Sequence, residues 1–453
     1  MSGREIEKRD RLNAALRALH GCFSITAPQM LDIAEKFHEA MLCGLVGRKG
    51  PLKMIPSFFG MPTGEESGVF LSVDFGGTNV RVSLIKLLGH GKITVLKKLS
   101  TFLKDPGGSY DYTSSAATGR ELFCFLAGQI AGLVGADATV PLGLTFSFPT
   151  KMYALDKAVL IGWTKEFKTR MTAGRDINIL LHDALQEQGL RGIKPVAVIN
   201  DTVGTLLTAA YGDPHADIGS ICGTGHNTCY FEPLPPQHRP MIINIESGNF
   251  DGLPVNDFDR ELDLKSEKPG EQVLEKMVSG RYLGELMRLV VLDLAHKGCL
   301  FQGKDSDMPG FPYQTNSLNA EHMSLMLGDK TTGLAGIAAW LKGSAGIQEP
   351  LLLELGALQT IASLLTARAA RLVASTCAGV LRRLDPLLKN PHTIAVDGSL
   401  YGKMTGFAPR LRAALDEILL DRAGQVTLKP TRDGSGMGAA IAAAMAVTSE
   451  TIR

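Results

Sequence analysis

The sequence has little of several features that would indicate other classes of protein. Its seven cysteines are scattered, odd in number and form no CxxC pair, so neither a disulfide framework nor a zinc site is indicated. Lys and Arg number 47 against 46 Asp and Glu, and this balance, with no basic stripe, argues against a nucleic-acid partner. The N-terminus carries mixed charges with no apolar segment behind them, so no secretory signal is expected.

Long uninterrupted apolar runs are also lacking. A run such as Leu351 to Leu353 is soon broken by Glu354, which argues against a membrane span. A reduced cytoplasm is therefore the expected location, and nothing in the sequence predicts the oligomeric state.

What is present is enough apolar material for two cores. Hydrophobic residues make up 45% of the chain and charged residues 21%, which is the composition of a globular protein. At 453 residues the default expectation is two domains. Each half contains a predicted strand, a turn with glycine and threonine, and a second strand; the turns are residues 74–79 and 223–227. This repeat predicts two α/β domains that face each other across a cleft.

Periodicity predicts where the helices and strands lie. Predicted helices cover residues 4–45, 120–133, 177–188, 201–211, a stretch from 269, 351–388 and 437–446. Predicted strands cover residues 69–73, 80–85, 142–146, 196–199, 218–221, 228–231, 241–245 and 393–396. Residues 301–349 show little periodicity, and no organisation is predicted for them.

The first glycine turn has the chemistry of a phosphate site. Gly76 and Gly77 allow positive φ and let backbone N–H groups approach an anion. Thr78 adds a hydroxyl donor, Arg81 a permanent positive charge and Asp74 a carboxylate suited to hydrated Mg²⁺. A simple hairpin turn explains the same glycines. The pattern is not a Walker loop, because GxxxxGK[ST] is missing, and not a Rossmann fingerprint, because a strand follows instead of a helix.

Three further glycine-rich segments offer similar chemistry. Gly223 and Thr224 stand at the corresponding place in the second half. Residues 433–436 precede a predicted helix, whose N-terminus would accept a phosphate, although taken alone this segment is more simply a glycine-rich helix cap. Residues 397–399 form another such loop after a predicted strand.

Asn200 and Asp201 follow an apolar predicted strand directly. An aspartate there is either the helix N-cap, which is the simpler explanation taken alone, or a catalytic base. Phosphoryl transfer to an alcohol needs a carboxylate within hydrogen-bond reach of the attacking hydroxyl. Further polar groups of the kind that a polyol site requires, each also explained by a solvated surface position, are Ser147, Thr164, Lys165, Asn227, Glu246 and Glu275.

In their order along the chain these segments resemble the signatures of the hexokinase family. The matching segments are residues 144–149, 163–165, 199–205, 223–225, 269–270, 275–277, 279–280, 282–285, 396–401 and 433–436. The resemblance covers nearly the whole chain from about residue 54, and its length resembles a single catalytic unit. It implies an actin-like (ribonuclease H-like) α/β fold, in which two mixed five-stranded sheets flanked by helices are separated by a sugar and ATP cleft. The small domain is expected over 64–199, joined by the C-terminal helix near 440–453, and the large domain over 1–63 and 200–439.

The resemblance also implies an activity and roles for single residues. The enzyme would transfer the γ-phosphoryl group of ATP, with Mg²⁺, to the 6-hydroxyl of a hexose, with glucose as the expected acceptor. Asp201 would be the general base, with Lys165 and Arg81 also in the catalytic set. The hexose contacts would be Ser147, Phe148, Pro149, Thr164, Lys165, Asn200, Asp201, Asn227, Glu246 and Glu275. The residues around Mg-ATP would be Asp74, also the metal ligand, Gly76, Gly77, Thr78, Asn79, Arg81, Gly223, Thr224, Gly398, Ser399 and Gly436.

Three departures from the family pattern are present, and the first two, which lie near the sugar-side loops, bear on the preferred hexose and its affinity. Residues 247–249 read Ser-Gly-Asn where the family usually has Trp-Gly-Ala, Met152 stands where many members have Gln, and His226 replaces a common Thr. A kinase for fructose or mannose therefore stays open. A catalytically silent hexose sensor also stays open, although it would have little need of Asp201. An actin-like assembly protein would leave the sugar-side residues without purpose, and a DNA-binding sugar repressor would need a helix-turn-helix or a zinc cluster.

Overall fold

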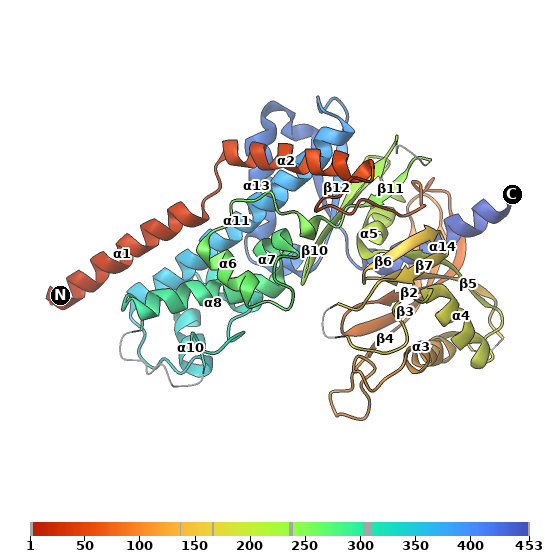
Figure 1. The fold of residues 1–453 in the computed structure, drawn as a ribbon, viewed down its shortest axis with the longest axis horizontal. Helices are drawn as coiled ribbons and strands as arrows, with labels where there is room; N and C mark the ends of the chain where they lie inside the picture. Colours follow the sequence, from red (N-terminus) through yellow and green to blue (C-terminus); the bar gives the residue numbers. More distant parts are fainter. Residues whose placement is uncertain (1–2, 136, 165–166, 235–238, 302–309, 452–453) are drawn as a thin grey trace.

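The computed structural model describes residues 3–135, 137–164, 167–234, 239–301 and 310–451, and it is built on two sheets flanked by helices (Figure 1). In the first sheet the strand order is β4-β3-β2-β5-β8. Its β2, β3 and β4 pair antiparallel, whereas β5 and β8 continue the sheet in parallel from β2. The strands are β2 (Ser67–Phe75), β3 (Asn79–Leu88), β4 (Ile93–Phe102), β5 (Val140–Phe146) and β8 (Ile193–Ile199).

The second sheet repeats this topology. Its order is β1-β11-β10-β9-β12-β13, with β9, β10 and β11 antiparallel and β12 and β13 parallel to β9. The five-stranded prediction therefore describes the repeated part, and the two-residue β1 adds a sixth strand at the edge. The strands are β1 (Ile55–Pro56), β9 (Ala216–Cys222), β10 (His226–Glu232), β11 (Met241–Asn244), β12 (His392–Asp397) and β13 (Val426–Pro430).

Most predicted elements are present, and the structure adds several that the periodicity did not reveal. The N-terminal helical stretch is two helices, because Thr26 begins the second with a capping box. The unassigned stretch 301–349 contains α9 and α10. The helices are α1 (Gly3–Phe23), α2 (Ala27–Leu45), α3 (Gly119–Val134), α4 (Ile177–Glu187), α5 (Asp201–Ala210), α6 (Asp257–Leu264), α7 (Val273–Val278), α8 (Gly280–His296), α9 (Ala320–Gly328), α10 (Ala335–Ser344), α11 (Leu352–Leu384), α12 (Ser399–Lys403), α13 (Phe407–Leu419) and α14 (Gly434–Thr451), with a small hairpin of β6 (Thr150–Ala154) and β7 (Lys157–Leu160).

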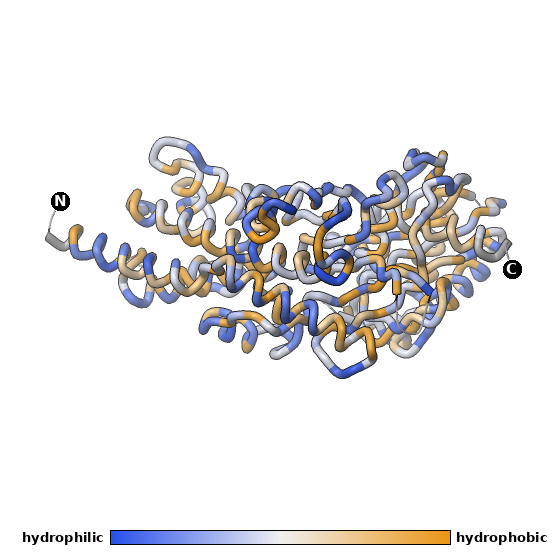
Figure 2. The backbone as a smooth tube through the Cα atoms, turned by 90° about the horizontal axis from the view of Figure 1, so that it is seen from above, coloured by the Kyte–Doolittle hydropathy of each residue, from blue (hydrophilic) through white to orange (hydrophobic). Residues whose placement is uncertain are grey.

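The longest helix, α11, runs through the half of the molecule that holds the second sheet (Figure 1). Among the described residues it alone is long and apolar enough to cross a membrane, but 83% of its apolar window is buried inside the protein. Buried apolar residues likewise form the core of this half. Hydrophobic and hydrophilic segments alternate along the backbone, and α1 projects from one end of the molecule (Figures 1 and 2). The apolar face of α11 is therefore accounted for by the core.

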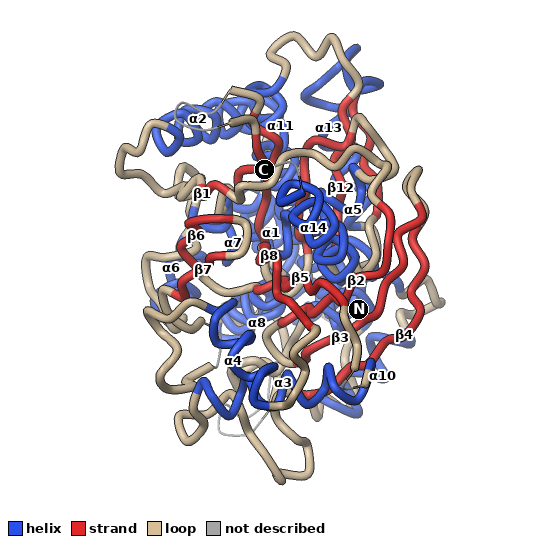
Figure 3. Tube along the Cα trace, turned by 90° about the vertical axis from the view of Figure 1, so that its right-hand side faces the viewer, coloured by secondary structure: helices blue, strands red, loops and turns tan. Residues whose placement is uncertain are grey.

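Two helices, α5 and α14, lie side by side where the two sheets approach each other (Figure 3). Glycines allow this close packing: a Cβ on Gly143 of β5 would collide with the Ala439 carbonyl of α14, and one on Gly438 would collide with Gly204 of α5. The helix predicted from residue 437 begins at Gly434. The glycine-rich segment before it is consequently the first turn of α14, fixed against both sheets.

Candidate functional site

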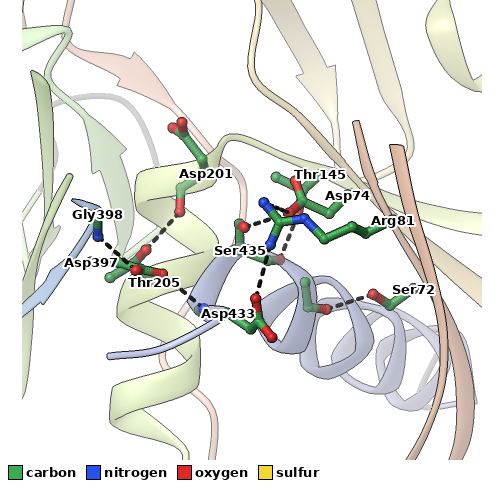
Figure 4. Close-up of polar contacts among 12 residues, drawn as sticks. Ser72, Asp74, Arg81, Thr145, Asp201, Thr205, Asp397, Gly398, Asp433 and Ser435 are labelled. Atoms are coloured by element: carbon green, nitrogen blue, oxygen red, sulfur yellow. Dashed lines mark hydrogen bonds and ion pairs between the residues drawn. The ribbon is translucent and has the colours of Figure 1, made fainter. Parts of the chain in front are cut away.

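The N-terminal turn of α14 is the point at which side chains from both sheets meet (Figure 4). Asp74, at the end of β2, accepts a hydrogen bond from the Ser435 hydroxyl at 2.9 Å. Thr145 of β5 donates its hydroxyl to the Ser435 carbonyl at 2.7 Å. From the second sheet, Asp397 accepts the Gly434 N–H at 2.9 Å. This turn therefore ties together the carboxyl ends of β2, β5 and β12.

Charged side chains gather on the first-sheet side of this turn. Arg81 of β3 places its guanidinium 2.9 Å from Asp433 and 3.5 Å from Asp74. Asp74 is only 5% exposed. Burial raises the pKa of the Asp74 carboxyl, and the nearby carboxylates of Asp201 and Asp433 raise it further, against the opposing effect of Arg81 and Ser435. Such a carboxylate is short of positive charge, which is the condition that favours a bound cation.

The first glycine turn, between β2 and β3, is open at its tip. Thr78 is exposed, and Gly76 donates its N–H to the Asn79 carbonyl at 3.2 Å. Gly76 does not adopt a positive φ, so the reason given above for a glycine at this position was wrong. A glycine at position 76 instead leaves room, because it has no Cβ, for an anion to approach the backbone N–H groups of the turn.

The second glycine turn, between β9 and β10, packs backbone against backbone. Gly398, which caps α12, has φ +116°, and a Cβ on it would collide with the Cys222 carbonyl. A Cβ on Gly223 would lie 3.3 Å from the Gly398 Cα. Thr224 is exposed at the tip, as Thr78 is in the first turn, and Ser399 is exposed at the start of α12. The predicted loops at 223–225 and 397–399 are thus neighbours.

The N-cap residue of α5 is Asn200, not Asp201. Its side-chain oxygen accepts the Thr202 N–H at 2.9 Å, and the Asp201 carboxylate accepts the same N–H at 2.8 Å. Asp201 is the first helical residue and is half-buried. Since the cap position belongs to Asn200, capping does not by itself explain an aspartate at 201.

Amide and carboxylate side chains form one network beside Asp201. Asn227 of β10 donates to Asn244 of β11 at 2.9 Å and lies 3.5 Å from the side-chain oxygens of both Asn200 and Glu246. Asn244 in turn donates to Glu246 at 2.9 Å. Glu275 of α7 accepts the backbone N–H of His226 at 3.0 Å. The structure therefore brings together the predicted hexose residues of the second half.

The predicted hexose residues of the first half surround a cluster of aromatic rings. Phe148 is 3% exposed and packs against the rings of Phe75, Phe146, Trp163 and Phe167. Ser147 donates its N–H to the Phe75 carbonyl, Pro149 accepts the Ile161 N–H, and Thr164 is half-buried. Lys165 lies outside the described residues.

A pocket lies between residues of these two groups. Phe148, Thr150 and Met152 line it together with Asn200, Asn244 and Glu246. Met152, one of the departures from the family pattern, is thus a wall of the pocket in which the candidate hexose contacts meet.

Sequence reasoning missed four residues of the site: Asn244, Ser435, Asp433 and Lys98. Asn244 had a signal, because it is the one polar residue of the apolar predicted strand 241–245 and stands two positions before Glu246. Ser435 and Asp433 lie in a segment that was singled out, but their partners in the first sheet are 290 or more residues away. No local pattern marks Lys98.

Two sheets with matching glycine turns, a half-buried carboxylate between them and a network of amide and carboxylate side chains fit a kinase for a small polyhydroxy compound. Comparison with known proteins narrows this class. The Hexokinase family profiles match residues 15–211 and 217–445. Hexokinase-2 of Oryza sativa subsp. japonica is 35% identical over 477 residues, covering 97% of this chain and 93% of the relative. Hexokinase-2 of Candida albicans is 34% identical over 466 residues, covering 96% and 92%.

Solved structures agree with this assignment. A hexokinase from Schistosoma mansoni complexed with glucose is 30% identical, with a TM-score of 0.83 over 96% of this chain and 99% of that one. A second hexokinase crystal structure is 33% identical, with a TM-score of 0.85. The chain belongs to the hexokinase family and is an ATP-dependent hexose kinase, and its two-sheet actin-like fold is the one expected from the sequence.

Proposed function

We propose that this hexokinase transfers the γ-phosphoryl group of ATP to the 6-hydroxyl of glucose, with Asp201 as the general base. The observation that carries this proposal is the half-buried carboxylate of Asp201, which adjoins both the charged turn of Asp74 and the amide network. A base there would accept the hydroxyl proton as the oxygen attacks phosphorus. Arg81 and Lys165 would stabilise the charge on the transferred group.

The hexose would be bound between the two groups of predicted hexose residues, of which Phe148, Asn200 and Glu246 line the pocket. Asn200, Asn227, Glu246 and Glu275 would hold hydroxyls from one side, with Asn244 orienting Asn227 and Glu246. The other side would be provided by Ser147, Phe148, Pro149, Thr164 and Lys165. A site with fixed hydrogen-bond partners can reject an analogue that lacks a hydroxyl by about 10⁴.

The nucleotide would lie along the two glycine turns and the first turn of α14. Its contacts would be Asp74, Gly76, Gly77, Thr78, Asn79, Arg81, Gly223, Thr224, Gly398, Ser399 and Gly436. Among the described residues no group of three or more His, Cys, Asp or Glu is placed to hold a metal. A single buried carboxylate with a raised pKa, that of Asp74, instead fits Mg²⁺ that arrives on the ATP phosphates and keeps most of its waters. When bound, Mg²⁺ would neutralise charge on the phosphates.

Domain closure would complete the site. The proposed moving units are residues 64–199 with the C-terminal helix near 440–453, and residues 1–63 with 200–439. Closure would exclude water, which competes with the hexose as a nucleophile. We expect the enzyme to act in the cytoplasm.

The test of substrate is a product-coupled assay with Mg-ATP and a panel of glucose, mannose and fructose. Glucose should show the highest kcat/KM. A higher kcat/KM for mannose or fructose would reassign the acceptor. No turnover on any hexose would contradict the whole proposal, and it is the result expected of a catalytically silent hexose sensor.

The test of the base is Asp201→Ala. We expect kcat to fall by about 10²–10⁴, because the proton acceptor is lost. Asp183→Ala, which removes an exposed carboxylate of α4, is the matched control and should keep normal activity. Binding is followed by the fluorescence of Trp163, beside Phe148 in the ring cluster, in a Trp340→Phe background. An Asp201→Ala enzyme with near-normal kcat would rule Asp201 out as the base.

A further inference from the structure

Asp433 is shared by two cations from neighbouring strands of the first sheet. Lys98 of β4 places its ammonium 2.5 Å from one carboxylate oxygen, and Arg81 of β3 places its guanidinium 2.9 Å from the other. Both contacts cross from the sheet to the loop before α14. Asp433 holds a left-handed backbone conformation, with φ +52°, which aims it at this sheet.

The strand register explains why the two cations reach one carboxylate. Arg81 pairs with Ser100, and Lys98 pairs with Ser83. Since alternate residues share a face of a strand, Arg81 and Lys98 lie diagonally on the same face. Both line one pocket together with Asp74 and Asp433. The neighbouring Lys97 has another partner, the carbonyl of Leu133, at 3.1 Å.

The charges of this cluster balance only when Lys98 is counted. Arg81 faces two carboxylates, Asp433 at 2.9 Å and Asp74 at 3.5 Å, so these three side chains alone carry a net negative charge. A triphosphate is itself strongly negative, and a negative cluster would repel it. Lys98 adds the charge that brings the cluster to neutrality. It also gives Asp433 a partner other than Arg81.

We propose that Lys98 is a positioning residue for nucleotide binding, which holds Asp433 so that Arg81 stays available to the phosphates of ATP. This inference rests on the proposed role of Arg81 as a phosphate contact. Lys98 acts through Asp433 and does not itself contact the nucleotide. Without Lys98, Arg81 would be the only cation facing Asp433 in this cluster, and its guanidinium would be held away from the phosphates.

The experiment compares steady-state kinetics of four variants. Lys98→Met should raise KM for ATP about fivefold, which is the upper range for a part-exposed charge pair, while kcat and KM for the hexose stay within about twofold. The increase should shrink in about 1 M salt, because salt screens exposed charges. Lys98→Arg should behave as the unmodified enzyme. Lys97→Met, the matched control, should leave all constants unchanged.

The decisive variant is the double substitution Lys98→Met with Asp433→Asn. Asn tolerates the left-handed conformation, and it removes the negative charge that Lys98 balances, so KM for ATP should return to normal. If KM for ATP of the double variant is as high as that of Lys98→Met alone, Lys98 contacts the phosphates directly. If KM for ATP of Lys98→Met is unchanged, Lys98 has no role in nucleotide binding. Either result overturns the proposal.

Arg81→Met separates this inference from the proposed function. If Arg81→Met leaves KM for ATP unchanged, Arg81 is not a phosphate contact and the proposed site itself fails. If Arg81→Met weakens ATP binding but Lys98→Met does not, only the inference about Lys98 fails.

Discussion

The two glycine turns occupy the same place in two sheets of the same topology, yet they are built from different physical interactions. In the first turn, the cross-strand pair next to the end of the hairpin is Asp74 with Arg81. In the second, the corresponding pair is Ile221 with Asn227. The first turn is therefore organised by charge, and the second by close backbone packing against Gly398. A repeated topology does not require repeated chemistry.

Two ionisable side chains beside the second turn, those of His226 and Cys222, are buried and uncharged. His226 is 3% exposed and its ring nitrogen Nδ1 lies 3.0 Å from the Ile221 carbonyl. Burial lowers its pKa to about 4. Close by, burial raises the pKa of the Cys222 thiol to about 12. Both groups are thus neutral at physiological pH, whereas four charged side chains, those of Asp74, Arg81, Lys98 and Asp433, meet beside the first turn.

Because the second turn depends on close backbone packing, a substitution there is expected to have the largest effect on stability. Gly398→Ala should destabilise the protein by about 3 kcal/mol, because the added Cβ meets the Cys222 carbonyl and φ +116° is strained for alanine. Thermal unfolding and KM for ATP measure the effect, and both should worsen. Gly402→Ala is the matched control, since its Cβ on α12 would have no neighbour within 4 Å. Equal stability of the two variants would show that the second turn does not depend on close packing.

Because the buried His226 beside the second turn is neutral, the free energy of unfolding is expected to depend on pH, with an effect of intermediate size. Because the folded-state pKa of His226 is near 4 and the unfolded value is about 6.5, only the unfolded chain binds this proton between those values. The free energy of unfolding should therefore fall as pH decreases, by about 2 kcal/mol from pH 7 to pH 5.

The measurement is urea unfolding of the unmodified protein and of His226→Thr at both pH values. The His226→Thr variant should not show this decrease in the free energy of unfolding between pH 7 and pH 5, whatever its absolute stability. His182→Gln, which replaces an exposed histidine of α4, should keep it. Parallel pH dependence in all three proteins would contradict the assignment.

The open first turn predicts the smallest effect on stability. Gly76→Ala should change the free energy of unfolding by no more than about 0.5 kcal/mol, because its Cβ would lie 3.4 Å from the Asn79 carbonyl and φ is not positive. KM for ATP should nevertheless rise, since the methyl group would obstruct the backbone N–H groups. A stability loss equal to that of Gly398→Ala would remove the distinction between the turns.

Local sequence was a good guide wherever function depends on a short segment. The two turns, the Asn200–Asp201 pair and the loop at 397–399 were all singled out, and the structure places each at the end of a strand. The strand β1 was missed because it is only two residues long. Asn244 was missed although it is the one polar residue of the apolar predicted strand 241–245. The positive-φ argument for Gly76 failed because backbone conformation in a four-residue turn depends on the pairing of both strands.

The sequence by itself determined the family, the order of the signature segments and the residue types of the candidate site, because those features are local strings. Only the tertiary structure decided which residues meet. Asp433 and Lys98 are 335 positions apart, and they face each other because α14 crosses to the first sheet through glycine contacts with β5 and α5. Ion pairs of this kind are set by topology and packing, which no local propensity records.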